Sequence, residues 1–290
     1  MTVHERSFKG YTGALTPSWR RFLVLPAFAL PNIFKSRLFL SLYLISLLPS
    51  LVETVIIYIR HNLRILEVFG ATPADFGPMT GEFFLRFISI QNGLTFALVL
   101  VAGPPLISSD LVNRGLPLYF ARPLGRLEYV LGKLAVLVIL LSPVTWIPQL
   151  LNYGLQGYLA GNGWFADNLR IGAGIVIGSW AWILTVSLIA LAVSATVKRK
   201  TMARLLFFSI FFILSIFGSI IAEGMRLAWG QVLNIMGMVW LVNSGLLGVP
   251  VPPNAHFPPA WAGWVTLAAV CALSLRMLAG KVRAYEVIKG

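Results

Sequence analysis

The clearest ionisable residue inside a long apolar run is Glu53, which lies within residues 38–59. A charged side chain at the centre of a membrane costs about 2.5–3.5 kcal/mol on insertion scales, so it usually faces a partner or a cavity. Two interpretations are open. The simpler one is that Glu53 reaches the outer lipid headgroups and pairs with Arg60 or Arg64. The alternative is that it marks a polar point on a route across the membrane.

Three polar side chains recur at helical spacing near the end of a later apolar run. Gln149, Asn152 and Gln156 stand at positions i, i+3 and i+7, which places them on one face of a helix. Either that face lines a translocation route, or it marks the helix leaving the bilayer. Glu53, Gln149 and Asn152 are therefore our candidates for a substrate path.

The residues that catalysis or metal binding needs are scarce. An active site requires a nucleophile, a base or a metal that converge on one point, and the apolar runs hold very few ionisable residues. The single cysteine, Cys271, supports neither a disulfide framework nor a cysteine metal site. The histidines are far apart, at positions His4, His61 and His256. We therefore expect no enzyme activity, no metal and no cofactor in this chain.

A second group of residues lies in the polar stretch Gly103–Lys133, between two apolar runs. The proline pair at 104–105 should end the preceding helix, because proline lacks the backbone donor. We expect a short amphipathic helix from Ser108 to about Phe120. Ser109 is its expected N-cap, and Asp110 lies in the first turn, where the helix dipole favours negative charge.

A stiff cationic turn is expected after this helix. Gly115 and Pro117 break the helix, and Arg122, Pro123 and Arg126 form a positively charged, proline-stiffened segment. One interpretation is a solvated connector whose arginines only set the membrane topology. A bare connector needs neither a helix nor a rigid turn, so we favour a segment that binds another protein.

The stretch resembles the loop between the second and third spans of ABC-2-type transporter permeases. The shared pattern is D-x-x-x-R-G followed by R-P-x-x-R-x-x-Y-V-x-G-K. In that family the loop is a coupling element that docks on a separate ATP-hydrolysing subunit. The resemblance therefore implies two ABC ATPase subunits, which use ATP and Mg²⁺, and a second permease copy or a related permease as partners. The residues that carry it are Asp110, Arg114, Gly115, Arg122, Pro123, Arg126, Tyr129, Gly132 and Lys133.

Composition indicates that the surroundings of this chain are a lipid bilayer. Of its 290 residues, 58% are hydrophobic and only 11% are charged, whereas soluble domains carry about 25% charged residues. The net charge of +13 does not indicate nucleic-acid binding, because the cations fall in short blocks between apolar runs. No G-x-x-x-x-G-K-[ST] pattern occurs, so any energy from ATP has to come through another subunit.

The pattern predicts an all-α membrane protein with six transmembrane helices. A span needs about 20 apolar residues to cross a hydrocarbon core of about 30 Å. A cytoplasmic N-terminal segment over residues 1–37 precedes the transmembrane domain over 38–278, and a basic cytoplasmic tail over 279–290 follows it. The six expected spans are residues 38–59, 83–107, 130–151, 171–197, 204–222 and 260–278.

The apolar residues 22–30 follow two arginines and are expected to form an N-terminal amphipathic helix in the inner interface. The alternative is a signal peptide with a cleavage site at Ala27-Phe28-Ala29. We disfavour the alternative, because cleavage would place Lys35 and Arg37 outside and five further spans follow.

Residues 227–249 are apolar enough to suggest another span, but glycine and asparagine interrupt them. A span here would also place the basic C-terminal tail outside. We therefore expect one or two short helices that dip into the outer leaflet as a re-entrant segment. A full crossing by Leu227–Val249 is the alternative.

The positive charges indicate the orientation. Eighteen of the 23 Lys and Arg residues fall in segments that we place inside, together with both termini. The five others are Arg60, Arg64, Arg86, Arg170 and Arg226. We expect a multi-pass protein of a bacterial-type cytoplasmic membrane, with both termini in the cytoplasm.

The resemblance implies the permease subunit of an ABC-2-type transporter, which couples ATP hydrolysis in a separate subunit to export of a substrate. The alternative is a membrane engine that transmits ATPase motion to a periplasmic or cell-surface partner without transport. An engine predicts a stable periplasmic partner bound through residues 60–82 or 223–259. An intramembrane enzyme is a third class, and the chain lacks the residues for it.

Overall fold

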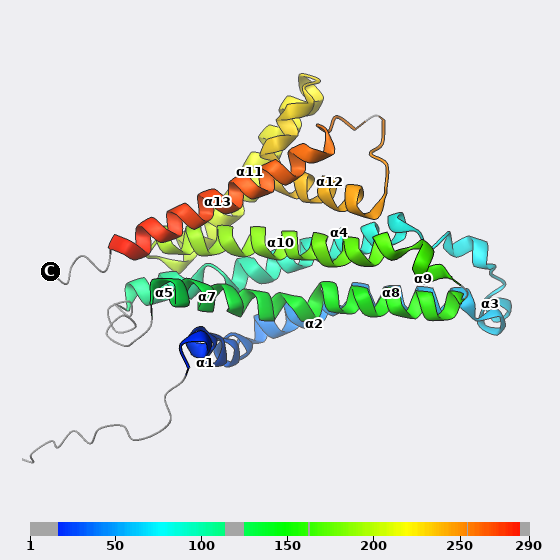
Figure 1. Cartoon of the computed structure of the whole chain (residues 1–290), viewed down its shortest axis with the longest axis horizontal. Coiled ribbons are helices and arrows are strands. Elements are labelled where there is room, and N and C mark those ends of the chain that lie inside the picture. Colours follow the sequence, from blue (N-terminus) through cyan, green and yellow to red (C-terminus); the bar gives the residue numbers. More distant parts are fainter. Residues whose placement is uncertain (1–16, 114–124, 162, 254, 285–290) are drawn as a thin grey trace, which may run out of the picture.

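The computed structural model describes residues 17–113, 125–161, 163–253 and 255–284, and over these ranges the chain is helical without a strand (Figure 1). Six helical stretches of the described residues are long and apolar enough to cross a membrane. The chain is therefore a multi-pass membrane protein, as its composition predicts. The six stretches are Arg37–His61, Gly81–Val112, Arg126–Ala160, Leu169–Thr196, Lys200–Gly224 and Ala260–Lys281.

A short helical segment precedes the first span and packs on the third. It consists of the 3-10 helix η1 (Ser18–Leu23) and the helix α1 (Val24–Phe34), which both contact α7 (Arg126–Leu141). The expected N-terminal helix is thus present. α1 contains no charged residue; Arg20 and Arg21 lie before it in η1, and Lys35 and Arg37 follow it, so the cations flank α1 rather than form a polar face.

The first span, α2 (Arg37–His61), buries only one narrow face. Ser36 caps it by accepting a hydrogen bond from the Phe39 backbone N–H at 3.4 Å. Many of its apolar side chains are exposed, as expected of a helix that faces lipid. The buried residues of α2 are Phe39, Ser46, Ser50, Glu53 and Ile57.

Two short elements follow α2, namely α3 (Leu63–Phe69) and the 3-10 helix η2 (Pro73–Phe76). The Thr72 backbone N–H and hydroxyl donate hydrogen bonds to Asp75 Oδ2, and these bonds lower the pKa of the Asp75 carboxyl. These local bonds stabilise the turn, and Arg60 of α2 adds a hydrogen bond to the Pro73 carbonyl at 3.4 Å.

The second span consists of two helices, α4 (Gly81–Ala102) and α5 (Pro105–Val112). The proline pair ends α4, as predicted. The predicted start of the next helix was wrong: α5 begins at Pro105, and Ser109 lies inside it rather than at its N-cap. Proline suits the first helical position, because the backbone N–H that it lacks has no partner there.

The third span is longer than predicted and is broken in the middle. α7 leads through the 3-10 turn η3 (Ser142–Val144) into α8 (Trp146–Ala160). Pro143 explains the break, since it interrupts the helical hydrogen bonds. The single-turn helix α9 (Trp164–Asp167) then leads into the next span.

The fourth span, α10 (Leu169–Thr196), lies in the middle of the bundle. It contacts α4, α5, α7, α8, α11, α12 and α13. Small residues permit this close packing: a Cβ at Gly178 would overlap Asn243, and one at Gly174 would touch Leu247.

The end of α11 projects from the bundle, whereas α12 and α13 pack on α10. α11 (Lys200–Ser219) ends in a π-helical turn, η4 (Ile220–Gly224), and both project from the other helices in Figure 1. Two short helices follow, η5 (Ala228–Leu233) and α12 (Ile235–Leu247), as predicted for residues 227–249. α13 (Ala260–Ala284) continues six residues beyond the predicted end of the last span, Leu278.

Candidate functional site

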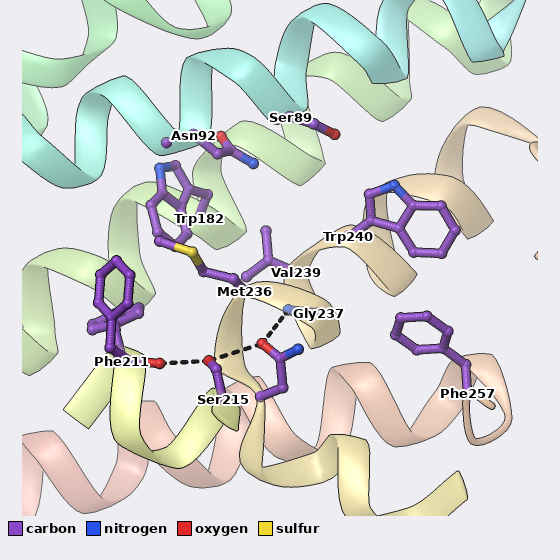
Figure 2. A pocket seen from close by; sticks show the side chains of 13 residues that line it. Ser89, Asn92, Trp182, Phe211, Ser215, Met236, Gly237, Val239, Trp240 and Phe257 are labelled. Atoms are coloured by element: carbon purple, nitrogen blue, oxygen red, sulfur yellow. Dashed lines mark hydrogen bonds between the residues drawn. The ribbon is translucent and has the colours of Figure 1, made fainter. Parts of the chain in front are cut away.

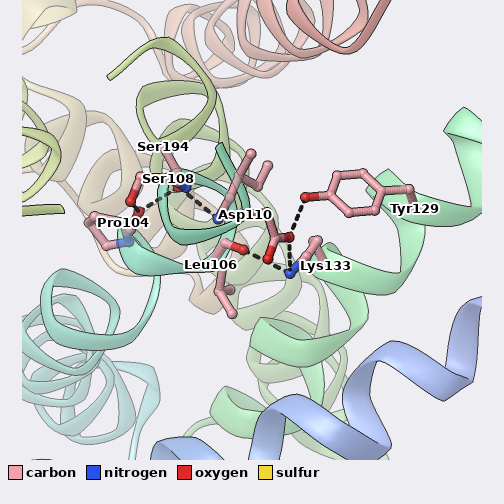
Figure 3. A network of polar contacts seen from close by, with 8 residues as sticks. Pro104, Leu106, Ser108, Asp110, Tyr129, Lys133 and Ser194 are labelled. Atoms are coloured by element: carbon pink, nitrogen blue, oxygen red, sulfur yellow. Dashed lines mark hydrogen bonds and ion pairs between the residues drawn. The ribbon is translucent and has the colours of Figure 1, made fainter. Parts of the chain in front are cut away.

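The structure brings together four of the predicted coupling residues. Asp110 on α5 meets Tyr129 and Lys133 on α7 where the second and third spans approach each other (Figure 3), and the fourth, Gly132, lies on α7 against the N-terminal segment. Arg126 is the first residue of α7. The other predicted coupling residues lie outside the described part of the chain; they are Arg114, Gly115, Arg122 and Pro123.

Asp110 and Lys133 form a largely buried ion pair that Tyr129 completes. Lys133 Nζ lies 2.7 Å from Asp110 Oδ2 and donates to the Leu106 carbonyl at 2.7 Å. The Tyr129 hydroxyl donates to the same Asp110 oxygen at 2.7 Å. The exposed fractions of the Lys133 and Asp110 side chains are only 7% and 17%. A largely dry ion pair with three charge-assisted contacts fixes α5 against α7.

Gly132 allows the N-terminal segment to approach α7. A Cβ at this position would lie 2.7 Å from the Phe22 carbonyl oxygen and 2.5 Å from Leu25 Cδ1. The carbonyl belongs to backbone and cannot give way as a side chain can. The N-terminal helix and the coupling residues are thus packed on the same turn of α7.

Ser194 of α10 caps α5 from a different span. Its hydroxyl accepts hydrogen bonds from the backbone N–H groups of Ile107 and Ser108, both at 2.9 Å, and donates to the Pro104 carbonyl at 2.5 Å. The first N–H groups of a helix have no partner within it, so this hydroxyl replaces an ordinary N-cap. Figure 3 shows Ser194 and Lys133 on opposite sides of α5.

A basic hollow lies beside α5. Its volume is about 590 Å³, and its walls come from α5 and from the turn between α10 and α11. Lys198, Arg199 and Lys200 are exposed along this turn. A positively charged surface thus lies next to the predicted coupling residue Asp110.

The three predicted path residues also come together, at the contact between α2 and α8. Glu53 is completely buried, and its Oε2 accepts hydrogen bonds from Gln149 Nε2 at 2.8 Å and Asn152 Nδ2 at 2.9 Å. Asn152 also donates to the Ser50 carbonyl at 3.0 Å and accepts from the Thr54 hydroxyl at 2.6 Å. The Asn152 amide is thus fully used in joining the two helices.

The simpler interpretation of Glu53 was wrong. Its carboxyl is packed between helices and reaches neither headgroups nor an arginine; Arg60 donates instead to the Pro73 carbonyl at 3.4 Å. Gln149 and Asn152 of the polar stripe face α2, where both donate to Glu53, and Gln156 is buried as well. Glu53 Oε1 and Gln149 Oε1 are buried without a hydrogen bond to any described residue.

Sequence reasoning missed two polar residues that bind these elements together. Gln91 on α4 accepts from the Ser50 hydroxyl at 3.4 Å and donates to the carbonyls of Ser46 and Val144. A glutamine inside an apolar run was a visible sign in the sequence that its side chain has a polar partner on another helix. Ser194 gave no sign, since a serine among small apolar residues is compatible with any packed helix.

No protein-family model matches the chain, and no curated protein matches it. Within the described ranges, no three His, Cys, Asp or Glu side chains gather in a way that could hold a metal ion.

Proposed function

We propose that the chain is the permease subunit of an ABC-2-type transporter, which exports a substrate with energy from a separate ABC ATPase. The observation that carries the proposal is the buried Asp110–Lys133 pair with Tyr129, at positions of the loop pattern. In this proposal these residues hold the base of the coupling loop. Both termini lie in the cytoplasm, and α12 lies in the outer leaflet.

The contacts at the base of the loop suit the transmission of force. Asp110 and Lys133 join α5 to α7, Ser194 joins α5 to α10, and Gly132 seats the N-terminal segment on α7. Displacement of the loop would therefore move three spans together rather than bend one. Charge-assisted bonds in a dry site resist such a load better than exposed ones.

The partners follow from the same geometry. Two ATPase subunits would each press on one coupling loop, so a second permease, identical or related, is required. The basic hollow along Lys198–Lys200 lies beside α5 and offers complementary charge to an acidic ATPase surface. The nucleotide and Mg²⁺ would be bound by the ATPase.

Transport is favoured over a membrane engine by the outer segments. α3, η2, η5 and α9 are short elements of four to seven residues, and α12 packs with α10 and α13 inside the protein. Such segments offer a periplasmic partner little area, since a stable interface buries about 800 Å² on each side. The Glu53, Gln149 and Asn152 cluster belongs to a substrate route only if α2 and α8 part during transport.

The test is a charge reversal in the loop. Arg122→Glu should abolish both binding of the partner ATPase and its stimulation in reconstituted vesicles, while the permease still inserts. The matched control is Arg64→Glu, an exposed arginine on α3 at the other end of the bundle. ATPase stimulation that survives Arg122→Glu, or that Arg64→Glu abolishes equally, contradicts the proposal.

A further inference from the structure

A second cavity lies where α11 leaves the bundle, away from the coupling residues. Its volume is about 440 Å³, within the range of about 300–1,000 Å³ that suits a small molecule. α4, α10, α11 and α12 supply its walls, and Phe257 lies at one side (Figure 2). It is separate from the Glu53 cluster, which lies between α2 and α8.

The walls of this cavity are mainly aromatic and carry no charge. Trp182 and Phe211 are fully buried and meet edge to face at 6.2 Å between ring centroids. On the other side of the cavity, the ring centroids of Trp240 and Phe257 lie 5.3 Å apart. No charged side chain is among the described residues that line the cavity. A charged ligand would therefore lose its hydration there without gaining a partner.

Several polar groups of the cavity are occupied, whereas the Asn92 amide and the Trp240 indole N–H have no hydrogen bond to a described residue. Asn234 Oδ1 accepts from the Ser215 hydroxyl at 3.0 Å and the Gly237 N–H at 2.9 Å, and Ser89 donates to the Leu85 carbonyl. Asn92 also lines the cavity, and no hydrogen bond joins its side-chain amide to a described residue. The two N–H groups and the carbonyl oxygen of the Asn92 amide, and the Trp240 indole N–H, are thus available to a ligand.

The cavity can be reached from the lipid beside α11. Phe212 lines it and is 43% exposed, and its neighbours Ile213 and Ile216 are exposed as well. A molecule that enters here arrives from the hydrocarbon, where uncharged apolar compounds concentrate. We infer that this cavity binds one uncharged, largely apolar or aromatic molecule that carries a single hydrogen-bonding group for Asn92. Binding itself does not depend on the proposed function. Only the further step, that the transported substrate is a molecule of this class, rests on that function.

The chain offers a substitution that should fill the cavity without disturbing the protein. Gly93 lines the cavity, and a Cβ built there meets no atom within 4 Å. Gly93→Leu therefore places a side chain in the space of the ligand. Gly154→Leu is the matched control, because Gly154 is also helical with open space around its Cβ and does not line the cavity.

Benzophenone is a suitable probe, because it is uncharged, has two rings and one carbonyl acceptor, and crosslinks to C–H bonds under light. The permease alone, in nanodiscs, is irradiated with benzophenone, and the adducts are mapped by mass spectrometry. We expect adducts on Met236 and Phe212. 4-Benzoylbenzoate and (4-benzoylbenzyl)trimethylammonium, which add one charge, should label these residues at least about tenfold less.

The variants decide between the outcomes. Gly93→Leu should reduce labelling at least about tenfold, Gly154→Leu should leave it unchanged, and Asn92→Leu should weaken it about three- to tenfold. If Gly93→Leu fails to fold, Asn92→Leu decides alone. The inference would be overturned if the charged analogues labelled the protein equally, or if Asn92→Leu left the labelling unchanged. Displacement of the probe by added phospholipid would also overturn it, because it would assign the cavity to an acyl chain. The assay contains no ATPase, so its result and that of ATPase docking are independent.

Discussion

At the scale of single residues, Glu53 shows what sequence can and cannot predict. Its type and its place in an apolar run marked it as unusual, and the spacing of Gln149 and Asn152 marked a polar helix face. That these features meet depends on how α2 crosses α8, which no local pattern contains. The result is a buried carboxyl whose Oε2 accepts two amide hydrogen bonds.

The Glu53 cluster gives a first prediction about stability. Glu53→Gln keeps the shape and one acceptor, so the free energy of unfolding in detergent should change by less than about 1 kcal/mol. Glu53→Ala leaves a cavity and two amides without their acceptor, and should cost about 2–4 kcal/mol. Glu67→Gln and Glu67→Ala serve as controls, because Glu67 is exposed and neither change should remove a buried contact. A loss for Glu53→Gln as large as that for Glu53→Ala would mean that the carboxyl itself is required.

The Asp110–Lys133 pair gives a second prediction. Lys133→Met leaves the Asp110 carboxylate largely buried with Tyr129 as its remaining side-chain partner, and should cost about 3–5 kcal/mol of unfolding free energy. Adding Asp110→Asn removes the stranded charge and should recover at least about 1 kcal/mol. Chemical unfolding of the two single variants and the double variant measures this coupling. Strictly additive losses would show that the two side chains do not interact.

At the scale of helices, apolar length predicted the spans well, because bilayer thickness sets that length whatever the neighbours are. The predicted start of α5 was wrong, and the reason is physical. Its first N–H groups are capped by Ser194 from another span, so no local cap such as Ser109 was needed. The cavity beside α11 was also out of reach, since it depends on the direction in which α11 leaves the bundle.

The packing of α1 on α7 gives a third prediction. Gly132→Ala puts a methyl group 2.7 Å from the Phe22 carbonyl oxygen, which belongs to backbone and has to shift. We expect the N-terminal segment to detach, with at least about a threefold faster cleavage by protease within residues 17–35, since local opening exposes the backbone. Gly154→Ala is the control, because its Cβ meets nothing within 4 Å. Equal cleavage of the two variants would show that this close approach is not needed.

At the scale of the whole molecule, the charge distribution predicts the orientation. Figure 1 shows α3 and α9 at one end of the bundle, and α5 with the last turns of α13 at the other. Most of the cations that we expect on the inside and that lie within the described ranges belong to segments at the second end, and the positive-inside rule predicts that this end is cytoplasmic.

The orientation gives a fourth prediction. In a Cys271→Ser background, Glu67→Cys should react with a membrane-impermeant maleimide in intact cells, because Glu67 is exposed on α3. Lys200→Cys, exposed beside the coupling residues, should react only after the membrane is permeabilised. The reverse pattern would place the coupling residues outside and exclude a cytoplasmic ATPase as their partner.

The central claim is that this chain works with a separate ABC ATPase. Gentle purification from native membranes, followed by mass spectrometry of the co-eluting proteins, tests it most directly. We expect an ATPase with a nucleotide-binding P-loop at one copy per permease, which is lost in Arg122→Glu and retained in Arg64→Glu. A permease that elutes without any ATPase, under conditions that preserve other membrane complexes, would show that the chain does not work with an ABC ATPase.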